Sequence, residues 1–473
     1  MSRLLRRAVW VLLGTLLSLA TFAGIAFAGV SAGMSDSFTA APKAALRGGL
    51  PPAAAVPEGR ITVAVAVSNE GSVAADVLAP FEVFASSDRF FVYTVAEKRR
   101  PSPLSGGASL LPDHTLEETG TAALPEPDVV VVPAVIDPSG EKEEPLRDWI
   151  TERAGRGARV LGVCAGSELV AATGLLDGRD ATSFWSNIGS LERDYPKVHW
   201  KRGERYVEDG EITTTAGITS GTVGALRVVE ELAGTAEAER IGQGLAYPGW
   251  SLDGPTRIAE NRQAPADLPY ALGAAFPWLR PTLGIGLVDG VGEIDAAAAF
   301  EVYEGVSFAF RSVPLAAGGR VTTRHGVVLL AQPAGDGAGS YGVDRLVVPG
   351  VTRASQVNEP LRGWASRHGL EVEMPGGGRA GGEFGFDPVL RDLAAHTDRA
   401  TALMTAKFSE YPSGHLKLSG PAWPWRTTSL AATTLVLSAG VGLAPTAIRR
   451  LVRRRRALRT GTGAETADRA NVA

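Results

Sequence analysis

The chain has 473 residues but only one cysteine and six histidines. A single cysteine excludes a disulfide scaffold and a cysteine-rich zinc site. No two histidines stand four residues apart, which is the spacing with which a helix presents two metal ligands. The Gly-rich stretch Met374–Phe386 lacks the spacing and the lysine of a phosphate-binding loop. The sequence therefore predicts neither a metal nor any other cofactor.

The net charge of −4 is a sum of unlike parts. Residues 1–10 carry +3 and residues 449–473 carry +6, so the remainder carries −13. An acidic body between two basic ends does not suggest a nucleic-acid partner. The chain is 45% apolar and 21% charged, which is typical of a globular protein, and its length predicts two or three domains.

Charged residues are missing from two long apolar runs, Ala8–Val30 and Thr427–Ile448. A helix of either length can span the hydrocarbon core of a bilayer. The triplet Ala26–Ala28 leaves open the alternative that the first run is a signal peptide that is cleaved after export. Trp423 and Trp425 before the second run, with clustered arginines after it, are typical of an interfacial anchor and a cytoplasmic stop.

This pattern predicts a protein of the cell membrane whose folded domains lie outside the cytoplasm. Residues 1–7 form a basic cytoplasmic stub, and residues 449–473 form a basic cytoplasmic tail in contact with lipid. Residues 31–59, rich in Ala, Pro and Gly, are expected to form a flexible linker. The bilayer is thus one predicted partner.

Short apolar runs alternate with segments of helical spacing between residues 60 and 250. Ile61–Val67 and Val129–Val132 are typical of strands buried on both faces. Ala74–Phe84 and Glu143–Arg153 have the spacing of amphipathic helices. This alternation predicts an α/β domain with a parallel sheet between two layers of helices.

The cysteine stands in the sequence GVCAG, between a predicted strand and a predicted helix. Gly-x-nucleophile-x-Gly in this context is the pattern of a nucleophile elbow, in which Cys164 would be the nucleophile. Gly162 and Gly166 permit the tight turn, and with Ala165 they are candidates for the pocket or the oxyanion site. The start of the next helix should favour the thiolate. The alternative is a buried structural cysteine.

Four segments, in order, resemble the ThiJ/PfpI family of the DJ superfamily, and especially the sensor-like domains of AraC-type regulators and isonitrile hydratases. They are ADVLAPFEVF (Ala75–Phe84), VVVVPA (Val129–Ala134), GVCAGSELVAATGLLDGRDATSFW (Gly162–Trp185) and TTAGITSG (Thr214–Gly221). The resemblance implies a flavodoxin-like sandwich related to class I glutamine amidotransferases. It also implies a function that ranges from hydratase or amidase to non-catalytic sensor.

The resemblance places a carboxylate partner for Cys164 at Asp76. A protonated carboxyl there would donate a hydrogen bond to the thiolate or relay a proton; the alternative for Asp76 is a helix N-cap. Glu82 is expected to pack or to form a salt bridge. Thr219 and Ser220 are pocket candidates, with helix capping as the alternative.

The chain departs from the family pattern in its histidines. Some members have a histidine directly after the cysteine, where this chain has Ala165, and others have one before the tryptophan, where it has Phe184. His199 is the nearest in sequence and is expected to be a surface strand residue. A cysteine–carboxylate pair is compatible with hydratase chemistry in the family and less so with proteolysis.

Residues 282–420 repeat part of the first region after a connector at 251–281. DVLAPFEVF at Asp76–Phe84 recurs as DAAAAFEVY at Asp295–Tyr303, 219 positions later. The later match of AYP (Ala246–Pro248) to EYP (Glu410–Pro412) has an offset of only 164, so the segment with the cysteine elbow is missing from the second region. We expect a truncated ThiJ/PfpI-like copy in which Asp295 is structural.

Two copies of one fold predict an intramolecular pseudo-dimer, with a homo-oligomer as the alternative. Two classes of function remain open. The protein is either an enzyme whose Cys164 adds to a small electrophile such as a carbonyl, isonitrile or amide, or a binding or redox-sensing module that uses the same pocket. A small-molecule substrate or ligand is the partner in both cases.

Overall fold

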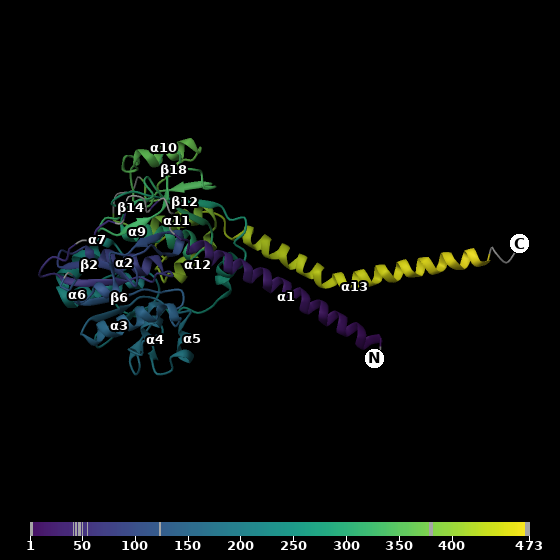
Figure 1. The fold of residues 1–473 in the computed structure, drawn as a ribbon, viewed down its shortest axis with the longest axis horizontal. Coiled ribbons are helices and arrows are strands. Elements are labelled where there is room, and N and C mark those ends of the chain that lie inside the picture. Colours follow the sequence, from purple (N-terminus) through teal and green to yellow (C-terminus); the bar gives the residue numbers. More distant parts are fainter. Residues whose placement is uncertain are drawn as a thin grey trace. The chain divides into compact units, whose positions relative to one another are not determined.

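A computed structural model describes residues 3–468 apart from 41, 43, 44, 46–48, 50, 54, 123 and 378–381. The chain divides into two compact units (Figure 1). The helical unit comprises residues 1–32, 272–278 and 425–473, and the body comprises residues 33–271 and 279–424. Each unit is described separately below.

The helical unit is built from two long helices, α1 (Arg3–Ser37) and α13 (Trp425–Asp468). Helix α1 extends to Ser37, so the predicted flexible linker begins later than residue 31. Helix α13 continues through the basic tail to Asp468 instead of ending with the apolar run. The segments Ala8–Ser37 and Trp425–Arg449 are long and apolar enough to cross a membrane.

Two glycines let α1 and α13 approach each other closely. A Cβ atom on Gly14 would lie 2.7 Å from the carbonyl oxygen of Gly442, so only glycine fits at this contact. Farther along, the guanidinium of Arg449 lies 4.3 Å from the centre of the Trp10 ring. The two helices therefore run antiparallel, with Arg449 of α13 beside Trp10 of α1.

The first region of the body contains a seven-stranded sheet in the order β10-β11-β7-β6-β1-β2-β5. All neighbouring strands are parallel except β10 and β11. The strands are β1 (Ile61–Ala66), β2 (Phe90–Ala96), β5 (His114–Thr115), β6 (Val129–Val132), β7 (Arg159–Gly162), β10 (Tyr206–Asp209) and β11 (Ile212–Thr215). The predicted flavodoxin-like α/β fold is confirmed.

Helices cover both faces of this sheet. They are α2 (Ala74–Ala85), α3 (Glu144–Gly155), α4 (Gly166–Ala172), α5 (Ile188–Asp194), α6 (Ser220–Ala233) and α7 (Thr235–Leu245). Along β1, Val63 and Val65 belong to the core beneath α2 and α6, whereas Ala64 and Ala66 belong to the core beneath α3 and α4. Burial on both faces explains why the strand sequence is apolar without interruption.

The second region contains a five-stranded parallel sheet in the order β16-β13-β12-β17-β18. The strands are β12 (Thr282–Leu287), β13 (Arg311–Ala316), β16 (Gln332–Pro333), β17 (Arg345–Val347) and β18 (Val372–Glu373), and the helices are α9 (Glu293–Phe300), α10 (Glu359–Arg367), α11 (Phe386–His396) and α12 (Arg399–Phe408). This order has the same pattern as β5-β2-β1-β6-β7 of the first sheet. That the second region is a truncated copy of the family fold stays a prediction.

The two regions pack against each other through segments that lie 219 positions apart in the sequence. Strand β4 (Ser109–Leu111) pairs antiparallel with β15 (Val328–Leu330), and Leu110 lies opposite Leu329. Strands β3 (Ser102–Pro103) and β14 (Arg320–Thr322) complete this four-stranded sheet. Helix α2 packs against α9 in a core that both regions share. Residues 219 positions apart thus face each other, as in a two-fold dimer.

Candidate functional site

Cys164 stands two residues after the end of β7 and has the conformation of a strained turn. Its φ of 55° lies in the left-handed region, which residues other than glycine rarely adopt. Gly166 begins α4 close to the end of β6: a Cβ atom there would lie 2.1 Å from the carbonyl oxygen of Val132. Strand, strained turn and helix have the arrangement that the GVCAG pattern predicts.

Both peptide groups around Cys164 are held by neighbouring side chains. Its N–H donates to Oγ1 of Thr215 at 3.3 Å, and its carbonyl oxygen accepts from Oγ of Ser183 at 3.0 Å. Cys164 is only 6% exposed. The elbow is therefore rigid, and its sulfur is buried.

Asp76 lies in the first turn of α2 and is fully buried. Its Oδ2 accepts from the N–H of Ala134 at 3.0 Å, while Oδ1 has no hydrogen-bond partner among the described residues. The N-cap of α2 is Val73, so the alternative of Asp76 as an N-cap is wrong. Burial, and to a smaller extent the charge of Glu301, hold the pKa of Asp76 well above its ordinary value. Its burial thus favours the neutral carboxylic acid over the carboxylate.

Two further carboxyl groups, from the second region, act on the same site. Glu301 accepts hydrogen bonds from the N–H of Ala75, at 3.3 Å, and from the Ser105 hydroxyl. Glu410 accepts from the N–H of Gly217 at 2.5 Å. Burial raises the pKa of Glu301 and that of Glu410 to about 7. Local sequence patterns could not reveal either role, because both depend on how the two regions pack.

Burial and these carboxyl groups act together on the thiol. Burial is the larger cause and raises the pKa of Cys164 well above its ordinary value, and ionisation of Asp76, Glu410 or Glu301 would raise it further. The N–H of Ala165 acts in the opposite direction. The N–H at the helix start thus favours the thiolate, as expected, but burial acts more strongly in the opposite direction.

Thr219 and Ser220 lie at the junction of the two regions. The Thr219 hydroxyl donates to the carbonyl oxygens of Ser409 and Glu410, at 3.1 and 3.2 Å, and lies 3.0 Å from the Tyr247 hydroxyl. Thr219 is the N-cap of α6 by position, but its side chain caps no helix N–H. The buried Ser220 hydroxyl has no hydrogen bond within the part of the chain that the structure describes, and it lies beside the Glu410 carboxyl.

The remaining predicted side chains are located as follows. His199 is an exposed residue of β9 (His199–Trp200), 3.4 Å from Asp180, as expected of a surface strand residue. Glu82 forms the expected salt bridge, with Arg324 at 3.2 Å, and its carboxylate also accepts from the N–H of Ile294 at 2.7 Å.

Folding brings together two groups of possible metal ligands that their spacing in the sequence does not reveal. Their donor atoms lie within 4.8 Å of one another; the groups are Glu82, Glu293 and His325, and Glu373, Asp392 and His396. In the first, His325 pairs with Glu293 at 2.8 Å while Glu82 pairs with Arg324. In the second, Arg345 pairs with both acids. These arrangements fit ion-pair networks.

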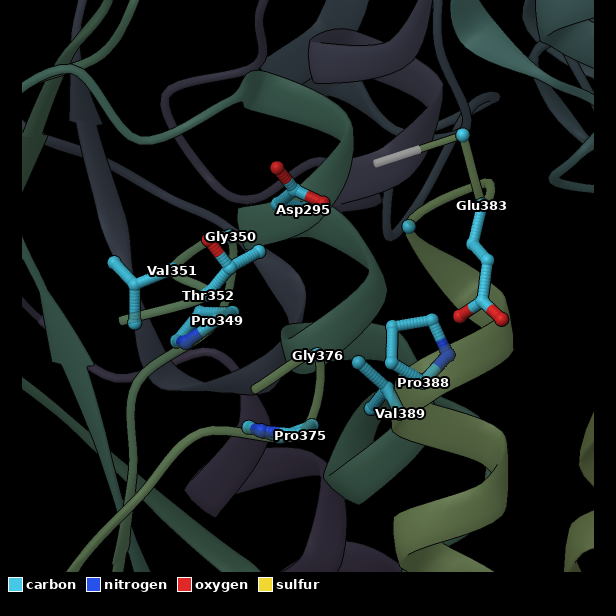
Figure 2. Close-up of a pocket in the computed structure, with 12 residues that line it drawn as sticks. Asp295, Pro349, Gly350, Val351, Thr352, Pro375, Gly376, Glu383, Pro388 and Val389 are labelled. Carbon is cyan, nitrogen blue, oxygen red and sulfur yellow. The ribbon is translucent and has the colours of Figure 1, made fainter. Parts of the chain in front are cut away.

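A cavity of about 160 Å³ lies in the second region (Figure 2). Asp295, which stands 219 positions after Asp76, lines it beside Gly350. The wall also includes Pro349, Val351, Thr352, Pro375, Gly376, Gly382, Glu383, Gly385, Pro388 and Val389. The chain's single cysteine lies in the other region, so this cavity has no thiol nucleophile.

Fold and turn together define a flavodoxin-like α/β protein with a cysteine in the strained turn between a strand and a helix. The model of the DJ-1/PfpI family matches residues 61–231. Isonitrile hydratase of Pseudomonas putida is 34% identical over 174 residues, which cover 36% of this chain and 72% of that protein. The chain therefore belongs to the DJ-1/PfpI family, and the predicted membership is confirmed.

Other relatives show how varied the family is. The HTH-type transcriptional regulator CdhR of Pseudomonas aeruginosa is 32% identical over 25% of this chain and 34% of its own length. The crystal structure of DJ-1beta from Drosophila melanogaster matches 39% of this chain and 97% of that chain, with 22% identity and a TM-score of 0.35. Enzymes and regulators thus both occur among the similar proteins.

Proposed function

We propose that the body is a cysteine-dependent hydratase or hydrolase of a small electrophile, with Cys164 as the nucleophile and Asp76 as the proton donor. The observation that carries the proposal is Oδ1 of Asp76, a fully buried oxygen without a hydrogen bond on a neutral acid beside the thiol. A buried polar atom without a partner is costly in a folded protein, and such atoms gather at reactive sites.

The reaction would begin with the neutral thiol. With an isonitrile, Sγ of Cys164 forms a bond to the terminal carbon, and the same carbon receives a proton from Asp76. The thiol proton then restores the Asp76 acid, so that no net charge is left in the buried site. The oxygen of a water molecule adds to this carbon while one water proton goes to the substrate nitrogen; the S–C bond then breaks, the formamide leaves, and the sulfur takes the remaining proton. The 34% identity with an isonitrile hydratase supports chemistry of this type.

The test uses the full-length chain in detergent, supplied with a small alkyl isonitrile, a small aliphatic amide and an α-oxoaldehyde, with products followed by NMR. We expect turnover of one of these classes, reduced at least about 100-fold in Cys164→Ser and in Asp76→Asn. Asp295→Asn, at the equivalent position of the second region, should keep the wild-type rate. Equal rates in wild type and Cys164→Ser, or no turnover of any class, would overturn the proposal.

A second candidate function is a non-catalytic sensor of a small ligand or an oxidant. It is favoured by the raised thiol pKa and by the burial of Cys164, both of which slow nucleophilic attack. Turnover separates the two candidates. A sensor binds its ligand, or gains one oxygen atom on Cys164 from hydrogen peroxide, without converting a substrate. The enzyme converts its substrate repeatedly.

We further propose that α1 and α13 both cross the membrane and that the body lies outside the cytoplasm. The contact of Trp10 with Arg449 supports this topology, because it brings the two basic ends to one side of the helix pair. The close contact of Gly14 with Gly442 gives α1 a packing role. It therefore favours a retained anchor over a cleaved signal peptide.

A further inference from the structure

Glu410 is a buried acidic residue near Cys164, and no pattern in the sequence predicts its place there. It belongs to the second region, directly after α12, and is only 8% exposed. Its φ of 50° lies in the left-handed region, as does that of Cys164. Strained residues that the surrounding structure holds in place are concentrated at ligand and switch sites. Here two such residues act on each other, because the charge of Glu410 raises the pKa of Cys164.

The groups around the Glu410 carboxyl are those that bind a carboxylate. The N–H of Gly217 donates to it at 2.5 Å, and the N–H of Trp185 also acts on it and lowers its pKa. The Ser220 hydroxyl lies beside the carboxyl and is fully buried. Two backbone N–H groups and a hydroxyl form a suitable site for one carboxylate group.

The fit of Glu410 leaves no space for a second molecule. A Cβ atom on Gly217 would lie 2.9 Å from Cγ of Glu410, so the side chain fits only because residue 217 is glycine. The adjoining cavity, which Trp185, Ser183 and Glu410 line, has about 10 Å³. This volume holds at most one water molecule. A side chain from the other region thus fills the space beside Ser183, whose hydroxyl donates to the Cys164 carbonyl oxygen.

We propose that Glu410 is the built-in occupant of a carboxylate-binding subsite at Cys164 and that it keeps the pocket closed. The subsite consists of the N–H groups of Gly217 and Trp185 with the Ser220 hydroxyl. Its external ligand is a small carboxylic acid, whose carboxylate takes the place of the Glu410 side chain. This inference rests on the proposed function only in so far as the Cys164 pocket is a ligand site.

The test follows alkylation of Cys164 by iodoacetamide in the full-length chain at one pH. Glu410→Gln removes the charge but keeps the volume, whereas Glu410→Ala removes both. Alanine fits this backbone, because Ala246, matched to Glu410 in the repeat, has a φ of 54°. We expect Glu410→Ala to react roughly tenfold faster than Glu410→Gln, since alkylation needs the opening that the side chain prevents. Acetate can occupy the space that the side chain leaves in Glu410→Ala, so it should slow the alkylation of this variant, with an effect that saturates as the acetate concentration rises. Acetamide at the same concentration should not slow it.

Equal rates in the two Glu410 variants, or protection by acetamide as strong as by acetate, would overturn the inference. Gly217→Ala is a second variant that expels the Glu410 side chain sterically, and it should also speed alkylation. The outcome is separable from that of the proposed function. Acetate protection without turnover of any electrophile would leave the carboxylate subsite standing and remove the enzyme. Turnover without acetate protection would support the enzyme and remove the carboxylate subsite.

Discussion

Glu82 and Glu301 exchange hydrogen bonds across the contact of α2 with α9: each carboxylate accepts from a backbone N–H of the other region. The Glu82 carboxylate accepts from the N–H of Ile294 at 2.7 Å, and the Glu301 carboxylate accepts from the N–H of Ala75 at 3.3 Å. Ala75 and Ile294 are 219 positions apart, as are Glu82 and Glu301. Each helix therefore receives at its N-terminus a carboxylate from the other.

This exchange explains why neither helix has a capping side chain of its own. The N-cap residues are Val73 for α2 and Gly292 for α9, and neither provides a capping oxygen. Unpaired N–H groups at a buried helix start must find acceptors elsewhere, and the dipole there favours negative charge. Glu301 provides the acceptor at α2, next to Asp76, and so connects the second region to the Cys164 site.

The exchange predicts that both regions depend on it for stability. We expect Glu301→Ala and Glu82→Ala each to lower the free energy of unfolding by roughly 1–3 kcal/mol, because each leaves a buried N–H without an acceptor. Urea unfolding monitored by tryptophan fluorescence measures the loss. Glu359→Ala, which removes an exposed ion pair with Arg362, is the control and should change stability by less than about 0.5 kcal/mol. Losses no larger than that of the control would contradict a shared interface.

The buried acids predict that the body loses stability as the pH rises toward neutrality. The pKa of Glu301 and of Glu410 is raised to about 7 from an ordinary value of 4.5, so the folded state keeps protons that the unfolded chain releases. Their contribution is complete below pH 4.5 and is lost as the pH rises through 7. Unfolding free energies between pH 4.5 and 7.5 should fall, and more gently in Glu410→Gln. A steeper fall in the variant would contradict this assignment.

Gly166 should be the least replaceable glycine of the elbow. In Gly166→Ala the new Cβ would lie 2.1 Å from the Val132 carbonyl oxygen, so strand and helix must separate, at about 2–4 kcal/mol. Gly155→Ala, on the exposed end of α3 with no atom within 4 Å, is the control. It should stabilise the protein slightly, because alanine favours helix. Unfolding free energies that do not differ between the two variants would argue against the observed turn.

The proposed topology predicts opposite results for two reporter fusions in bacteria. A fluorescent protein that matures only in the cytoplasm should be bright when fused after Ala473, because the arginine-rich end of α13 is retained inside. Fused after Pro424, without α13, it should be exported and dark. A dark full-length fusion would contradict the topology.

Sequence patterns predicted the parallel sheet and the strand–turn–helix at Cys164, because both follow from local spacing and from burial on two faces. They could not predict the acids around the thiol. Glu301 and Glu410 come from beyond residue 282, and their contribution depends on the self-complementary packing of the two regions. The expected thiolate rested on the helix start alone, whereas burial of Cys164 raises its pKa more than the Ala165 N–H lowers it.

The pH dependence of Cys164 alkylation in the full-length chain tests most directly whether acids from both regions control the pKa of the thiol. Cys164→Ser provides the blank, and Glu301→Gln, Glu410→Gln and Asp76→Asn are the variants. We expect the apparent pKa of Cys164 in the wild type to lie above the ordinary thiol value of about 8.5. We expect this pKa to fall in Glu301→Gln and in Glu410→Gln, because each variant removes a negative charge. An apparent pKa at or below the ordinary value, unchanged in the glutamate variants, would contradict a thiol that is controlled by acids from both regions.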